Sequence, residues 1–132
     1  MDAALIRLVW LRAGYRCEYC LMPQQFDEIT FELDHIISRK HGGLTVPHNL
    51  ALSCFWCNSF KGSDLGGLDP RTRKLTPLFN PRRQKWVSHF RWEGHSLRGI
   101  TAIGRVTVAV LHINDAYRLE LREGLIEEGL FP

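Results

Sequence analysis

The sequence predicts a small α+β fold, and three observations support this class. Apolar side chains recur with helical spacing near both ends of the chain. Residues 30–37 alternate apolar and polar side chains, which is typical of a half-buried strand. Two Cys-x-x-Cys pairs, Cys17/Cys20 and Cys54/Cys57, bracket that strand. With 132 residues and 45% hydrophobic content, the chain can bury a modest core.

The first half of the chain divides into short elements. Residues 2–13 have apolar side chains at i, i+3 and i+4 spacing and predict a helix that stops near Gly14. The strand at 30–37 is followed by a glycine-containing loop at 38–48 and a second short strand at 49–52. We therefore expect two strands joined by a long loop.

The second half alternates helical and extended segments. A short helix is expected at about 58–65, ended by Gly66 and Gly67. The aromatic-rich stretch 86–100 predicts one or two strands, and 104–111 is a short apolar segment. A final helix at about 115–128 should begin at an N-cap residue. Asn114 is the candidate N-cap. The apolar residues at helical spacing are Tyr117, Leu121 and Leu125.

Charge is distributed unevenly along the chain. The net charge is +3, but residues 65–98 alone hold 8 basic and 2 acidic side chains. Such a segment suits a polyanion, because neutralised phosphates release counterions; a solvated loop is the alternative. We expect a core at 1–66 and a C-terminal extension at 67–132, in which a basic loop, short strands and the final helix pack on the core.

The cysteines indicate a metal site. Neither a signal peptide nor an apolar run of membrane-spanning length is visible, so we expect a cytoplasmic protein with no membrane partner. In a reducing compartment, paired cysteines bind metal more often than they form disulfides. Four thiolates suit a tetrahedral structural Zn²⁺. Two disulfides or four unrelated buried cysteines are the competing interpretations.

A second site is indicated by Asp34, His35 and Asn58. Carboxylate and amide oxygens suit an octahedral ion such as Mg²⁺ or Mn²⁺, which keeps positions for water and a phosphate. A neutral imidazole beside that ion can take a proton from an attacking water. Strict strand alternation would put Asp34 and His35 on opposite faces, so they can share a site only where the strand ends or twists.

These motifs occur in a specific order and spacing. The order is Cys17-x-x-Cys20, Glu32-Leu33-Asp34-His35-Ile36, Gly42-Gly43, Asn49-Leu50 and Cys54-x-x-Cys57-Asn58-x-x-Lys61. The run resembles the HNH endonuclease family, with its ββα-metal fold and, in one subset, a zinc site made of four cysteines. A weaker resemblance to the C-terminal extension of bacterial stand-alone HNH proteins covers Leu78–Arg82, Trp86–Trp92 and Gly104-Arg105.

The resemblance implies hydrolysis of DNA phosphodiester bonds with one divalent ion, leaving 5′-phosphate and 3′-hydroxyl ends. It implies that His35 is the general base, that Asp34 and Asn58 are metal ligands, and that Asn49 ties the loop between the strands and supports the base. Asn58 stands where many members have a histidine, which favours Mg²⁺ or Mn²⁺ over a softer metal.

The contacts with nucleic acid are predicted from basic residues near the site and in the extension. Each of them could equally be a solvated side chain. The candidates are Arg39, Lys40, Lys61, Arg82, Arg83 and Lys85.

Two alternatives to a DNA endonuclease stay open. One is a zinc-stapled nucleic-acid-binding module without catalysis, and the other is a nuclease directed at RNA. One site per chain makes one cut, so a monomer would nick DNA, whereas a homodimer could cut both strands.

Overall fold

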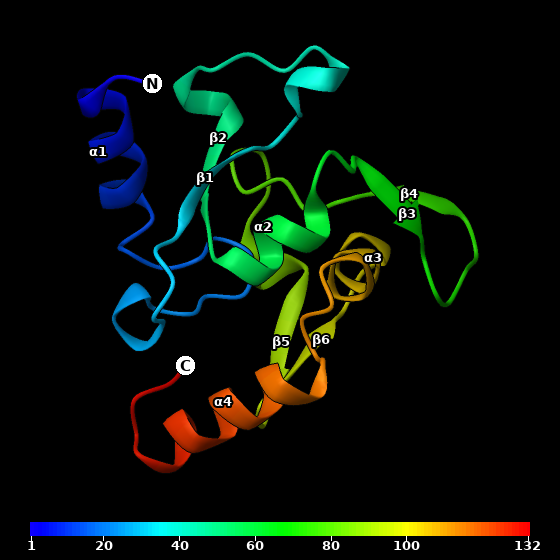
Figure 1. Cartoon of the computed structure of the whole chain (residues 1–132). Helices are drawn as coiled ribbons and strands as arrows, with labels where there is room; N and C mark the ends of the chain where they lie inside the picture. The colour runs from blue at the N-terminus through cyan, green and yellow to red at the C-terminus, as the bar shows by residue number, and fades with distance from the viewer.

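Two antiparallel strands and one helix form the centre of the molecule (Figure 1). The computed structural model describes residues 1–132. Strand β1 (Glu32–His35) pairs with β2 (Leu50–Ser53) so that Glu32 lies opposite Ser53 and His35 lies opposite Leu50. Helix α2 (Phe55–Lys61) follows β2 directly. This β-β-α order confirms the predicted fold class.

Helix α2 begins earlier than its sequence pattern predicts. Cys54 occupies the N-cap position, and its Sγ accepts a hydrogen bond from the backbone N–H of Cys57 at 3.4 Å. The predicted range 58–65 was therefore wrong at both ends, because the cysteine pair itself forms the first turn. Gly66 and Gly67 do not terminate the helix but begin the next strand.

The flanking elements comprise three more helices and two hairpins. Helix α1 (Ala3–Arg12) is capped by Asp2, whose Oδ1 accepts from Leu5 N at 2.8 Å. Beyond the central unit come β3 (Gly66–Leu68), β4 (Leu75–Pro77), β5 (Phe90–Glu93), β6 (Ser96–Gly99), α3 (Ala102–Val110) and α4 (Ala116–Glu127). Short 3₁₀ turns lie at Gln24–Phe26, Arg39–His41, Pro47–Asn49 and Trp86–Ser88.

Two details of the extension differ from expectation. The apolar segment at 104–111 belongs to helix α3, which packs so tightly that a Cβ on Gly104 would lie 2.0 Å from His89 O. Asp115, rather than Asn114, occupies the N-cap position of α4. The Asn114 amide instead pairs with the backbone of Leu97, accepting from its N–H at 2.9 Å and donating to its carbonyl at 2.8 Å.

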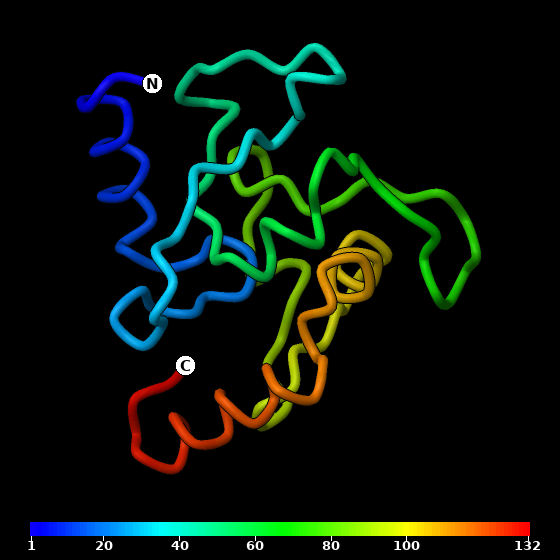
Figure 2. Tube along the Cα trace, in the orientation of Figure 1, coloured from blue at the N-terminus to red at the C-terminus, as the bar shows by residue number.

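One hydrophobic cluster of 18 buried residues includes side chains from both halves of the chain. Phe79, Phe90 and Leu97 of the extension share it with Leu50 and Leu52 of β2. Figure 2 shows the red C-terminal end of the chain running back toward the first half, and Phe131 near that end is buried in the cluster. None of the helices combines the length and apolarity needed to cross a membrane.

Candidate functional site

The four cysteines form a buried tetrad (Cys17, Cys20, Cys54 and Cys57). Their sulfur atoms all lie within 4.8 Å of one another, and no side chain in the tetrad is more than 2% exposed. Cys20 Sγ and Cys54 Sγ are 3.8 Å apart, which is far from a disulfide bond of about 2.0 Å. A tetrahedron with metal–sulfur bonds of about 2.3 Å has edges of roughly 3.8 Å. The donor set therefore fits a structural zinc ion.

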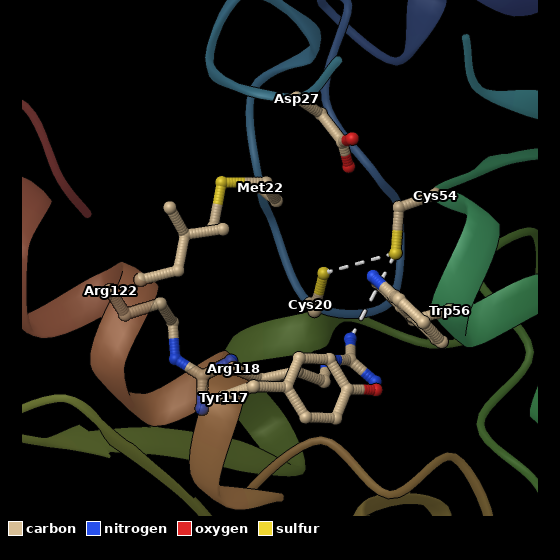
Figure 3. A pocket seen from close by; sticks show the side chains of 9 residues that line it. Cys20, Met22, Asp27, Cys54, Trp56, Tyr117, Arg118 and Arg122 are labelled. Atoms are coloured by element: carbon tan, nitrogen blue, oxygen red, sulfur yellow. Dashed lines mark hydrogen bonds between the residues drawn. The ribbon is translucent and has the colours of Figure 1, made fainter. Parts of the chain in front are cut away.

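Two arginines of helix α4 lie against this tetrad. Arg118 is 4% exposed, and its Nη2 donates to Cys57 Sγ at 3.0 Å. Figure 3 shows Arg118 pointing from α4 toward Cys54, whose sulfur is 3.9 Å from the same nitrogen. Arg122 is 1% exposed and lines the same small cavity with Cys20. Neither arginine forms an ion pair with a carboxylate.

The buried guanidinium of Arg118 requires a nearby negative charge, because an unpaired buried cation is strongly unfavourable. Arg122 is satisfied differently: it donates to His95 O, Ile113 O and Asn114 Oδ1, and burial lowers its pKa. Burial works to lower the pKa of Arg118, but the charges of Cys57, Cys20 and Cys54 outweigh burial and raise that pKa above its ordinary value. A divalent ion with four thiolates carries a net charge of about −2, which Arg118 partly offsets through its contacts with Cys57 and Cys54. This charge balance supports metal-bound thiolates over neutral thiols.

The burial of Arg118 and Arg122 in helix α4 could not be predicted from the sequence pattern. Tyr117 and Leu121, two of the apolar residues that suggested this helix, are 41% and 44% exposed. The buried positions are Arg118 and Arg122, four residues apart on one face. A pair of arginines at helical spacing usually indicates a solvated face. Nothing in the sequence shows that a charged sulfur cluster lies opposite.

Asp34, His35 and Asn58 line one shallow, open depression at the end of β1. Strand β1 ends at His35, which allows neighbouring residues to reach the same depression. Ser38 and Arg39 from the following loop complete its wall. We call this depression the His35 pocket (Leu33, Asp34, His35, Ser38, Arg39, Asn58 and Gly62).

Asp34 is the most enclosed of the three. It is 4% exposed, and its oxygens accept from Tyr19 Oη at 2.7 Å and Lys61 Nζ at 3.1 Å. Burial raises the pKa of Asp34, while the charge of Lys61 and the Tyr19 hydrogen bond oppose that rise. A carboxylate has about four lone-pair positions, so two remain available for a metal ion.

His35 has a hydrogen-bond partner that sequence pattern did not indicate. Its Nε2 lies 2.8 Å from Thr45 Oγ1, in the loop between β1 and β2. When Nε2 carries the hydrogen and donates it to Thr45, Nδ1 keeps a free lone pair. This tautomer leaves the imidazole able to accept a proton.

Asn58 and Asn49 have different roles in the geometry. The Nδ2 of Asn58 donates to Glu32 Oε2 at 3.1 Å, which leaves its Oδ1 free. Asn49 is buried and crosslinks the loop between the strands: its Oδ1 accepts from Ile37 N, and its Nδ2 donates to Ile37 O and Leu44 O, each at 2.9 Å. Asn49 therefore connects both ends of the loop that carries Thr45.

The two glycines of this loop are required for separate reasons. Gly42 has φ of 88°, a left-handed conformation that favours glycine. A Cβ on Gly43 would lie 1.7 Å from Ile37 O. The Gly42-Gly43 pair thus allows the loop to close against the end of β1.

The predicted nucleic-acid contacts divide into exposed and sequestered residues. Lys61 is 2% exposed and donates to Asp34 and to the carbonyls of His35 and Ile36, so we assign it to the scaffold rather than to DNA. Arg82 is ion-paired with Glu18 and only 15% of its side chain is exposed. The remaining candidates are solvent-exposed: Arg39, Lys40, Arg83 and Lys85.

Comparison with known proteins agrees with this geometry. The HNH endonuclease family model matches residues 17–64. The Septu protein PtuB of Bacillus thuringiensis is 29% identical over 106 residues, covering 79% of this chain and 38% of that protein. The chain thus spans well under half the length of this relative. No solved structure matches significantly. The matched segment, residues 17–64, contains both the cysteine tetrad and the His35 pocket, so both candidate sites lie in the part of the chain that is similar to HNH endonucleases.

Proposed function

We propose that the protein is a metal-dependent endonuclease that hydrolyses DNA phosphodiester bonds at the His35 pocket. The observation that carries this proposal is the placement of Asp34, His35 and Asn58 around one open depression. The family match supports nuclease activity in general.

In this proposal, Asp34 and Asn58 hold one Mg²⁺ or Mn²⁺ ion through oxygen atoms. Both residues line the pocket, and the Glu32 hydrogen bond leaves Asn58 Oδ1 free for an ion. When bound, such an ion stabilises negative charge on the phosphate and on the leaving oxygen.

His35 takes the proton from the attacking water. The hydrogen bond between Nε2 and Thr45 orients the ring, and Nδ1 is the atom that accepts the proton. Asn49 supports this arrangement indirectly, because it holds the loop that carries Thr45. Exposed Arg39 at the rim of the pocket is placed to contact the DNA backbone.

The test is cleavage of supercoiled plasmid with Mg²⁺ or Mn²⁺, comparing wild type with His35→Ala. We expect the variant to cut about 10²–10⁴-fold more slowly, the usual contribution of a general base. Its thermal stability should be unchanged, because His35 is partly exposed and outside the core. Equal rates for the two proteins would refute the assignment of the base. A structured RNA in parallel reactions separates DNA from RNA preference.

One observation favours a second candidate, a nucleic-acid-binding module without catalysis. Both oxygens of Asp34 already accept hydrogen bonds inside the protein, which weakens the carboxylate as a metal ligand. This alternative predicts salt-sensitive DNA binding with no cleavage in any divalent metal. The plasmid assay and a binding assay on the same sample distinguish the two.

A further inference from the structure

The β3–β4 hairpin ends in an exposed and strongly basic turn. Three cations, Arg71, Arg73 and Lys74, lie within four residues, and we call them the basic tip. All three side chains are exposed, and none forms an ion pair. Figure 2 shows this part of the chain, in green, at the outer edge of the molecule. The basic tip therefore carries charge that the protein does not neutralise.

Asp69, the one acid in the hairpin, is used to shape the turn. It is 0% exposed, and its oxygens accept from Arg71 N at 3.2 Å, Thr72 N at 3.3 Å and Thr72 Oγ1 at 2.8 Å. Arg105 of helix α3 completes the arrangement with two parallel hydrogen bonds of 2.9 Å. Such a bidentate pair is geometrically specific. The three cations are thus presented by an ordered turn rather than by a loose loop.

The hairpin is also anchored at its base. Gly67 of β3 packs so closely on α3 that a Cβ there would lie 2.8 Å from Val110 and 3.3 Å from Val106. The hairpin follows helix α2 after a short connection, and Gly62 at the end of α2 lines the His35 pocket. Figure 1 shows the hairpin extending outward from the C-terminal end of α2. The base of the hairpin is therefore joined through a short connection to the helix that carries Asn58 and Gly62 of the pocket.

An ordered cluster of unpaired cations on a two-stranded ribbon suits duplex DNA. Like charges held together repel one another, and phosphate groups relieve that repulsion while releasing counterions. A two-stranded β-ribbon is also narrow enough to enter the major groove. Leu68 and Leu75 beside the turn are 50% and 81% exposed, so apolar contacts with base or sugar edges are available.

We propose that the basic tip binds the phosphate backbone of duplex DNA and thereby positions the strand for the His35 pocket. This inference rests on the proposed nuclease function. It assigns the main DNA contacts to Arg71, Arg73 and Lys74. None of these residues is among the contacts predicted from sequence, which were Arg39, Lys40, Lys61, Arg82, Arg83 and Lys85.

The test measures binding of a labelled DNA duplex by fluorescence anisotropy at several salt concentrations, with His35→Ala as the parent so that the probe stays intact. The variant replaces all three cations of the basic tip with alanine. Each lost phosphate contact lowers the slope of log K against log salt by about 0.9, so the slope should fall by roughly 3 and affinity by tenfold or more. The control removes the same number of exposed cations elsewhere: Arg7, and Arg91 and Arg98, which pair with Glu93.

The outcomes separate the two proposals. Unchanged affinity and slope in the tip variant, or an equal loss in the control, would overturn the hairpin assignment. Binding of single-stranded DNA or of RNA with the same tip dependence and greater affinity would overturn the choice of duplex DNA. Tip-dependent duplex binding in a wild-type protein that never cleaves would support the hairpin and refute the nuclease. Far-UV circular dichroism confirms that each variant is folded.

Discussion

The cysteine tetrad and the His35 pocket differ in the surroundings they offer a metal ion, although both depend on the same β-β-α unit. The tetrad is enclosed, with side chains at most 2% exposed, and the buried cations Arg118 and Arg122 lie against it. The His35 pocket is open, and its proposed ligands are two oxygens with room for water. The tetrad suits a metal held as part of the fold, and under our proposal the open pocket holds a second metal that exchanges with solvent.

The two regions meet at adjacent residues. Cys57 belongs to the tetrad, and Asn58 lines the His35 pocket one residue later in helix α2. Tyr19, between two cysteines in sequence, also donates to Asp34. A metal that fixes the tetrad therefore also orders the residues around the proposed catalytic ion, and its loss should lower both stability and activity.

The largest expected effect follows from breaking the tetrad. Cys54→Ala should abolish zinc binding and cooperative unfolding, because structural zinc supplies about 10–16 kcal/mol of apparent binding free energy in small metallodomains. That exceeds or matches the roughly 5–15 kcal/mol that stabilises a typical domain. Thermal unfolding followed by circular dichroism, together with zinc content, measures the effect. Ser59→Ala, at an exposed position on the same helix, is the control and should behave as wild type.

A smaller effect should follow from removing the cation beside the tetrad. Arg118→Met leaves the buried sulfur charge without its hydrogen-bond donor and should lower the free energy of unfolding by about 3–5 kcal/mol. Zinc should also pass faster to a competing chelator. Arg91→Met, at an exposed arginine, should change neither quantity. If Arg118→Met keeps the wild-type free energy of unfolding and the wild-type rate of zinc transfer, Arg118 does not stabilise the thiolate charge.

The smallest expected effect concerns the open pocket. Thr45→Val removes the oxygen that pairs with His35 Nε2 and should lower the cleavage rate about tenfold, since one hydrogen bond contributes roughly 0.5–1.5 kcal/mol. Thr45→Ser keeps the hydroxyl and should restore the rate. Stability should not change, because Thr45 is exposed. If valine and serine give the same rate, Thr45 does not orient the base.

The central unit could be predicted because its residues are constrained by local chemistry. The cysteine spacing, the Asp34-His35 pair and the asparagines each required a particular residue type at a particular interval. Asn49 makes hydrogen bonds to Ile37 and Leu44 of the loop, and its support of the base stays a prediction. The prediction of a strand end near Asp34 and His35 also agrees with the limits of β1.

The extension was harder to predict because its important contacts are non-local. Hydrophobic spacing drew attention to Tyr117 and Leu121, which are exposed, whereas the buried residues of α4 are Arg118 and Arg122, and Arg118 donates to the sulfur cluster. Gly66 and Gly67 suggested a helix stop, whereas close packing on Val106 and Val110 explains the second glycine. Sequence alone suggested that Lys61 contacts phosphate or solvent, because the buried Asp34 to which it donates lies 27 residues earlier in the chain.

The most direct test removes the exchangeable metal while leaving the tetrad intact. Purified protein is treated briefly with EDTA and desalted, and the same sample is assayed for zinc content, circular dichroism and plasmid cleavage with and without added Mg²⁺ or Mn²⁺. Our account predicts one zinc per chain, an unchanged spectrum, no cleavage without added metal and full recovery with it. Undiminished cleavage without added metal, or activity that falls only in step with zinc loss, would contradict the separation of a structural from a catalytic metal.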